Sequence, residues 1–373
     1  MEKVYYTEPY RKSIKCRPEE KTIFYPECGG QPGDRGWADD IKILDTKKAD
    51  DGSSVYVLEN GGTLDNTKEY EFKLDWDHRY KYMVMHACQH MLSGLLFTMF
   101  DIGTVAVHLG EDYLTIEVGQ EKVEEKVVEE LIKAANKKIE EGHKIIYHEM
   151  SHSQAEALGL RRSIKVEGDV RIVEIEGVDC IACGGVHASS TSEIRLVLFT
   201  GHEQIRGHER LIFKCGQDAV DYALANGKII SEVTGKLSCT AAELLPKFEK
   251  LSSELSEAKA KAAVYAAKVA KTVIDQNLKD GVAAFETDLD IQAIVSCASE
   301  YTDLALCAFN GNHWCIVLKG KYEKTDFNVI RKDLLSLVGA KGGGRTPVFQ
   351  GIATDTGAVG KVLSGFCSCL VKD

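Results

Sequence analysis

The stretch from Tyr80 to Phe100, YKYMVMHACQHMLSGLLFTMF, decides the fold of the region around it. Its spacing predicts an amphipathic helix, because apolar residues and two histidines recur at near-helical intervals: Met83, His86, His90, Leu92 and Leu96. The two histidines are four residues apart, so their imidazoles project from one helix face and could reach a common metal ion. Packing alone could also place such a pair. Alanine at position 87 excludes the metalloprotease pattern, which has glutamate there.

A second motif, Cys183-Gly-Gly-Val-His187, favours metal binding over packing for this histidine pair. It lies in a turn-rich segment between strand-like runs at Arg171 to Ile175 and Glu193 to Phe199, so we expect it on a loop or hairpin. The two glycines let such a loop fold a thiolate and an imidazole toward one point.

Together, His86, His90, Cys183 and His187 form a plausible tetrahedral zinc set, with Cys180 as a competing ligand. A catalytic zinc usually keeps one open coordination position, whereas four protein ligands usually make a closed structural site. Hydrolysis at this site would therefore need a displaced ligand, a fifth position, or a metal that only orients the substrate. The sequence leaves these three alternatives open.

The rest of the chain indicates an α+β, multidomain protein. We expect a small N-terminal β-barrel module at 1–75, with strands such as Val55 to Leu58 and Tyr70 to Leu74, and an α+β zinc domain at 76–215. A long helical linker follows at 216–282, and Thr240 and Glu243 fit a capping box within it. Its apolar residues alternate spacings of four and three from Leu244 to Val269, which fits either packing on its own domain or a coiled coil. Strand and helix patterns return at 283–373, which we expect to be an α/β domain with a helix at Asp326 to Val338.

The bulk composition is that of a globular protein: 373 residues, 44% hydrophobic and 28% charged. Met1 to Lys15 lacks the apolar run of a signal peptide or membrane anchor, so we expect a cytoplasmic protein whose twelve cysteines are mostly reduced thiols. The net charge of −11 argues against a nucleic-acid partner, but local basic clusters could still bind phosphate. Three such clusters occur: Arg161, Arg162, Lys165 and Arg171; Arg206, His208 and Arg210; and Lys341 with Arg345.

Three blocks of the sequence resemble the alanyl-tRNA synthetase editing domain and its free-standing relatives, the AlaX trans-editing proteins. The blocks are Phe24-Tyr-Pro-Glu-Cys-Gly-Gly-Gln-Pro-Gly-Asp-Arg-Gly36, His86-Ala-Cys-Gln-His90-Met-Leu-Ser93 and Cys183-Gly-Gly-Val-His187. The resemblance implies a zinc-dependent hydrolase that removes serine or glycine from misacylated tRNA(Ala). An alanine-sized pocket cannot exclude glycine and rejects an added hydroxyl only modestly, so a second, hydrolytic site is needed.

The C-terminal run Gly339-Ala-Lys-Gly-Gly-Gly-Arg-Thr-Pro-Val-Phe-Gln-Gly351 is similar to the DHH-associated domain that ends alanyl-tRNA synthetases. This resemblance implies a long-form AlaX protein that binds tRNA and dimerises through the long helix or the last domain. The residues expected to bind tRNA are Lys341, Gly342, Gly343, Gly344, Arg345, Arg206 and Arg210. Glycine amides and arginine are suited to phosphate.

Four residues are candidates for orienting the substrate: Gln31, Gln89, Glu27 and Asp34. The chain departs from the family pattern at Ala87, where Thr or Ser is common, at Val186, where Thr is usual, and at Cys28, where Ser or Gly is usual. These departures put serine recognition in question. They keep open a non-catalytic alternative, a tRNA-binding protein whose zinc is structural.

Overall fold

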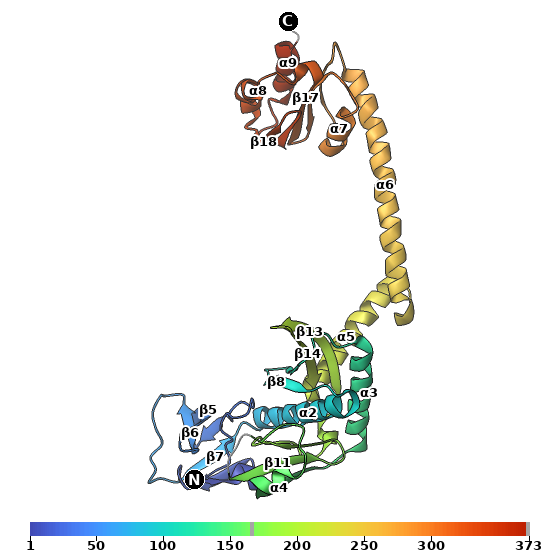
Figure 1. The fold of residues 1–373 in the computed structure, drawn as a ribbon. Helices are drawn as coiled ribbons and strands as arrows, with labels where there is room; N and C mark the ends of the chain where they lie inside the picture. Colours follow the sequence, from blue (N-terminus) through green and yellow to red (C-terminus); the bar gives the residue numbers. More distant parts are fainter. Residues whose placement is uncertain (165–167, 371–373) are drawn as a thin grey trace. The chain divides into compact units, whose positions relative to one another are not determined.

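A computed structural model describes residues 1–164 and 168–370 (Figure 1). The chain divides into two compact units, Met1–Glu232 and Val233–Asp373. Among the described residues, no helix is both long enough and apolar enough to cross a membrane.

The first unit begins with a five-stranded antiparallel sheet whose order is β2-β7-β4-β5-β6. Its strands are β2 (Ser13–Cys16), β4 (Gly36–Ala38), β5 (Ile41–Lys48), β6 (Ser54–Leu58) and β7 (Tyr70–Leu74). Alternate side chains, including Phe72 and Ile43, are buried on one face against Phe24. The predicted strands β6 and β7 are confirmed. The edge strands β2 and β6 do not pair with each other in the described residues, so the sheet is open where we expected a closed barrel.

Three short elements complete this N-terminal module. Strand β1 (Glu2–Lys3) pairs in parallel with β3 (Lys21–Thr22), and α1 (Val4–Thr7) follows β1 directly.

Helix α2 (Trp76–Phe100) is the central element of the rest of this unit (Figure 1). Asp75 caps it by accepting a hydrogen bond from His78 N, and Asp101 ends it in the left-handed region at φ 55°. Its apolar side chains, such as Leu92 and Leu96, share a core with α3 (Glu125–Glu141) and a four-stranded antiparallel sheet. The sheet order is β13 (Val197–Ile205), β14 (His208–Cys215), β9 (Leu114–Val118) and β8 (Thr104–Leu109).

A three-stranded antiparallel sheet precedes the loop that contains Cys183 and His187. It consists of β10 (Ile145–Ser151), β11 (Asp169–Ile175) and β12 (Asp179–Ala182), with α4 (His152–Glu156) after β10. The strand expected at Glu193 to Phe199 is partly wrong. A 3-10 helix, η1 (Thr191–Ile194), occupies its first half because Ser190 accepts from Ser192 N and starts a turn there.

Helix α5 (Gly216–Leu237) leads from the sheet into the second unit, where the 3-10 turn η2 (Ala241–Glu243) and α6 (Leu244–Asn277) follow. The capping box predicted at Thr240 and Glu243 is present, and α6 confirms the predicted long helix.

A five-stranded sheet forms the body of the second unit: β15 (Val282–Glu286), β16 (Leu304–Asn310), β17 (His313–Lys319), β19 (Val348–Ile352) and β18 (Lys341–Arg345), in that order. Only β15 and β16 pair in parallel among these strands. The end of α6 and α7 (Ile291–Ala298) cover one face. The other face carries η3 (Gly320–Tyr322), α8 (Phe327–Asp333), η4 (Leu335–Val338) and α9 (Val359–Leu370). The single helix expected at Asp326 to Val338 is thus divided into α8 and η4.

Candidate metal centre

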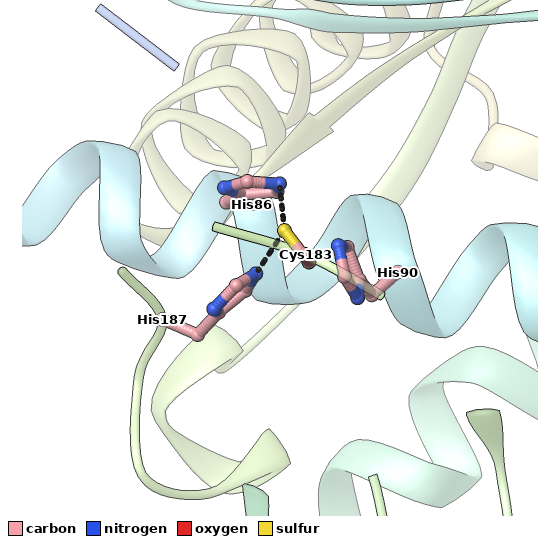
Figure 2. Close-up of side chains that lie close together, drawn as sticks. All are labelled: His86, His90, Cys183 and His187. Carbon is pink, nitrogen blue, oxygen red and sulfur yellow. Dashed lines mark hydrogen bonds between the residues drawn. The ribbon is translucent and has the colours of Figure 1, made fainter. Parts of the chain in front are cut away.

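His86 and His90 lie on one face of α2, one turn apart, and both are buried (Figure 2). Their ring centroids are 4.9 Å apart. The i, i+4 spacing of the helix therefore produces the half-site that the sequence indicated.

The loop after β12 supplies the other two side chains, Cys183 and His187, which face the histidines of α2 in Figure 2. Cys183 Sγ lies 3.6 Å from His86 Nε2 and 3.7 Å from His187 Nε2. The ligand atoms of all four residues lie within 4.8 Å of one another. Cys180, the competing ligand, belongs to β12 and is not part of this cluster.

These separations fit one tetrahedral ion. Zinc bonds of about 2.0–2.1 Å to nitrogen and about 2.3 Å to sulfur, at the tetrahedral angle, place sulfur and nitrogen about 3.6 Å apart. Three imidazoles and one thiolate are also a donor set that zinc prefers over harder cations. The four residues therefore fit a metal ion in both distance and chemistry.

Burial sets the charge states of the four side chains. It lowers the pKa values of His86 and His187 well below their ordinary range, with further lowering from neighbouring histidines and Arg171. It lowers the pKa of His90 to about 3, with further lowering from Arg161 and Arg171. Burial also raises the pKa of the Cys183 thiol to about 11. The histidines are neutral, as metal ligands must be, and a cation that binds here would displace the thiol proton.

Glycine at position 185 is required by the packing of this loop. A Cβ atom there would lie 2.2 Å from His86 Cε1 and 2.4 Å from His86 Nδ1. The loop backbone can pass the histidine ring only without a side chain.

Arg171 of β11 holds the loop from the other side. Its Nη1 donates to the carbonyl oxygens of Cys183 and Gly185, at 3.0 and 2.7 Å. Its guanidinium is sandwiched between the rings of Tyr6 and Tyr147, 4.5 and 4.0 Å from their centroids. The Tyr147 hydroxyl donates to His187 O and accepts from His187 N, both at 3.1 Å.

Sequence reasoning missed this role of Arg171 and placed the residue in a phosphate-binding cluster. Arg161 of the same cluster is also engaged internally, donating from Nε and Nη2 to the two carboxylate oxygens of buried Asp179. Lys165 lies outside the described residues. The strand pattern at Arg171 to Ile175 could have indicated this role, because that strand directly precedes the segment that contains Cys183.

The four candidate orienting residues occupy different surroundings. Gln31 is 1% exposed, and its Oε1 lies 2.9 Å from His86 Nδ1. Gln89, one residue before His90, is buried and donates to Ser93 Oγ at 2.8 Å.

Asp34 and Glu27 have their partners elsewhere. Asp34 is buried and accepts from Arg79 Nε at 2.8 and 2.9 Å, whereas Glu27 is exposed and pairs with Lys47 at 2.6 Å. Of the four candidates, the structure brings Gln31 into contact with a member of the cluster.

The expected tRNA-binding residues lie at the surface of their own units. Lys341 to Arg345 form β18, an edge strand that is exposed throughout. Arg206 occupies the turn between β13 and β14 at φ 51°, and Arg210 of β14 pairs with Glu117 and Glu203 at 3.5 and 3.7 Å.

Comparison with known proteins relates the loop half of the cluster to synthetase-derived domains. Residues 170–212, which include Cys183 and His187, match the family described as the threonyl and alanyl tRNA synthetase second additional domain.

Relatives that match longer parts of the chain point to a narrower family. The chain is 31% identical to the alanyl-tRNA editing protein AlaX-L of Pyrococcus horikoshii, over 68% of this chain and 67% of that protein. It is 30% identical to the alanyl-tRNA editing protein Aarsd1 of Danio rerio, over 62% of this chain and 56% of that protein. It is 25% identical to the alanine-tRNA ligase of Pyrococcus abyssi, over 98% of this chain and 43% of the ligase. The chain belongs to the AlaX-type alanyl-tRNA editing family.

Proposed function

We propose that this chain is a zinc-dependent, trans-acting hydrolase that removes serine or glycine from misacylated tRNA(Ala) in the cytoplasm. The observation that carries the proposal is the convergence of His86, His90, Cys183 and His187 within 4.8 Å, in a chain whose relatives are alanyl-tRNA editing proteins. When bound, zinc would supply positive charge that fixes the aminoacyl group and polarises its ester.

A cavity of about 490 Å³ beside Cys183 offers a place for the acylated 3′ end. Its lining includes Gly29 of the N-terminal module, Arg162, Asp169 and Gly184. The volume falls within the usual range for small-molecule sites, about 300–1,000 Å³. The tRNA end would therefore enter between the N-terminal module and the metal domain, with Arg162 beside its phosphate.

Residues of this chain would hold the ester close to the metal. Gln31 and Gln89 lie next to the ligands and are proposed to position them and the aminoacyl group. Asp34 is proposed to position the site indirectly. Its ion pair with Arg79 joins the glycine-rich block to α2, which carries His86 and His90. Glu27, paired with Lys47 on the surface, is the least favoured of the four.

The departures from the family pattern lie outside this cavity lining. Ala87 is fully buried in the apolar core of the metal domain, and Val186 is buried against Tyr5, Tyr25 and Met83. Neither side chain is therefore expected to weaken serine recognition directly.

For the whole molecule, we propose that β18 and Arg206 contact the tRNA backbone and that residues 283–373 form a DHH-associated domain. The exposed glycine strand leaves backbone amides accessible to phosphate, and Lys341 and Arg345 add positive charge. We propose that α6 mediates homodimerisation.

A deacylation panel tests the proposed function. Purified, zinc-loaded protein should release serine, glycine or both from tRNA(Ala) and should leave Ala-tRNA(Ala) intact. Failure to release either amino acid would overturn the proposal.

The alternative, a tRNA-binding protein with a structural zinc, is favoured by the four protein ligands of the cluster. Cys183→Ala separates the two functions. A hydrolytic centre predicts lost deacylation in a folded protein, whereas a purely structural zinc predicts unfolding of the module and no hydrolysis by the wild type.

A further inference from the structure

The two halves of the candidate metal centre meet at the side-chain amide of Gln31. Its Oε1 lies 2.9 Å from His86 Nδ1, on the helix half, and 3.0 Å from the backbone nitrogen of Val186, on the loop half. Gln31 and His86 are 1% and 3% exposed, so water does not compete for these bonds.

The backbone contact settles which way the amide points. The Val186 nitrogen can only donate, so the atom facing it must be the amide oxygen and not the amide nitrogen. That oxygen carries no proton, so His86 Nδ1 must donate to it. A neutral imidazole has one N–H, which leaves the lone pair of Nε2 free on the side of Cys183.

We infer that Gln31 is a positioning residue that holds His86 in the tautomer able to bind a metal through Nε2 and joins helix α2 to the Cys183-His187 loop. This inference rests on the proposed metal centre. General experience with metal sites supports it, because the outer hydrogen bond of a ligating histidine fixes both its tautomer and its ring orientation.

The other two histidines have no equivalent bond. His90 Nδ1 lies 3.8 Å from Asp179 Oδ2, beyond hydrogen-bond distance, and His187 Nδ1 has no partner among the described residues. Of the three histidines, His86 is therefore the one whose Nδ1 is held by a hydrogen bond, and Gln31 is its partner.

Gln31 belongs to the glycine-rich block of the N-terminal module, where it closes a turn with Cys28. The metal ligands themselves come from elements after residue 75. Metal affinity would therefore depend on the N-terminal module, although this module contributes no ligand.

The test uses Gln31→Met, which removes the acceptor at similar length, and Gln31→Glu, which keeps an oxygen. Gln217→Met is a matched control, because Gln217 is an exposed glutamine of the same unit, hydrogen bonded to Arg195. Cobalt(II) is titrated into each full-length, reduced protein, and the visible spectrum reports affinity and thiolate ligation. Gln31→Met should bind cobalt about 10–100-fold more weakly, while Gln31→Glu and Gln217→Met stay close to the wild type.

Nitrogen NMR of the imidazoles gives an independent answer in the metal-free protein. His86 should be protonated at Nδ1 in the wild type and in Gln31→Glu, and should lose this preference in Gln31→Met. Equal cobalt affinity in Gln31→Met, or a wild-type His86 protonated at Nε2, would overturn the inference. A wild type that binds no cobalt would overturn the metal centre instead, and the tautomer spectrum would still decide the role of Gln31.

Discussion

At the scale of single residues, the candidate metal centre requires glycine at one position of the Cys183-His187 loop. Gly185 passes the ring of His86 so closely that a Cβ would lie 2.2 Å from it, whereas a Cβ on the neighbouring Gly184 would meet only the Tyr6 hydroxyl at 3.6 Å. The two adjacent glycines of one motif thus carry different constraints.

Gly185→Ala should therefore displace His86 or the loop and lower stability by about 1–3 kcal/mol, the usual cost of overpacking. It should also weaken metal binding, while Gly184→Ala should behave like the wild type. Cobalt titration and urea unfolding measure both effects. Equal behaviour of the two variants would show that the loop passes His86 with more space than the structure gives it.

Arg79 is the buried cation that joins the N-terminal module to α2. Its guanidinium bonds to Asp34 and to the carbonyl oxygens of Pro9 and Ile23, and both charged side chains are almost fully buried. Replacing one partner leaves the other charge without compensation.

Arg79→Met should lower the free energy of unfolding by about 3–5 kcal/mol, because Asp34 remains buried and unpaired. The double variant Arg79→Met with Asp34→Leu should recover much of this loss. Urea denaturation of the two variants and the wild type checks the prediction. A loss below about 1 kcal/mol in the single variant would contradict it, since that is the usual effect of an exposed pair.

At the scale of elements, α6 presents apolar side chains to solvent along one seam. Phe248, Leu251, Leu255 and Tyr265 are 42–66% exposed and follow the alternating spacing of a coiled coil. A single helix with such a seam gains stability when a second helix covers it.

The proposed dimer predicts that Leu255→Glu shifts the protein to a monomer in sedimentation equilibrium at micromolar concentration. Val264→Glu is the matched control, because Val264 is equally exposed, 55% against 56%, but lies off the seam. The control should remain dimeric. A monomeric wild type, or equal dissociation of both variants, would rule out this interface.

Elements with regular spacing were predictable, and those set by local side-chain bonds were not. The positions of β7 (Tyr70–Leu74) and α2 followed from periodicity. The first half of the strand expected from Glu193 is a turn instead, because Ser190 starts a turn there and the Glu193 carboxylate accepts from Ser189 N and Tyr10. The glycine run Gly342–Gly344 was not predicted as a strand, but it pairs with β19.

At the scale of the whole molecule, the four residues of the candidate metal centre were predictable and the side chains that support them were not. Each ligand pair lies within five residues of sequence, so a helix and a loop position it locally. The supporting contacts, such as those of Arg161 with Asp179 and of Arg171 with Tyr6, form only when separate segments of the chain fold together. The spacing of residues in the sequence does not predict such contacts. Gln31 was found through its motif, while its bond to His86 required the structure.

Hydrolysis by this chain is proposed to depend on a metal ion held by His86, His90, Cys183 and His187. The direct measurement is deacylation of Ser-tRNA(Ala) by protein stripped with a chelator and then titrated with zinc, with bound metal counted by native mass spectrometry. We predict that stripping abolishes deacylation and that activity returns in proportion to bound zinc, up to one ion per chain. Full activity in protein shown to be free of metal would contradict the account.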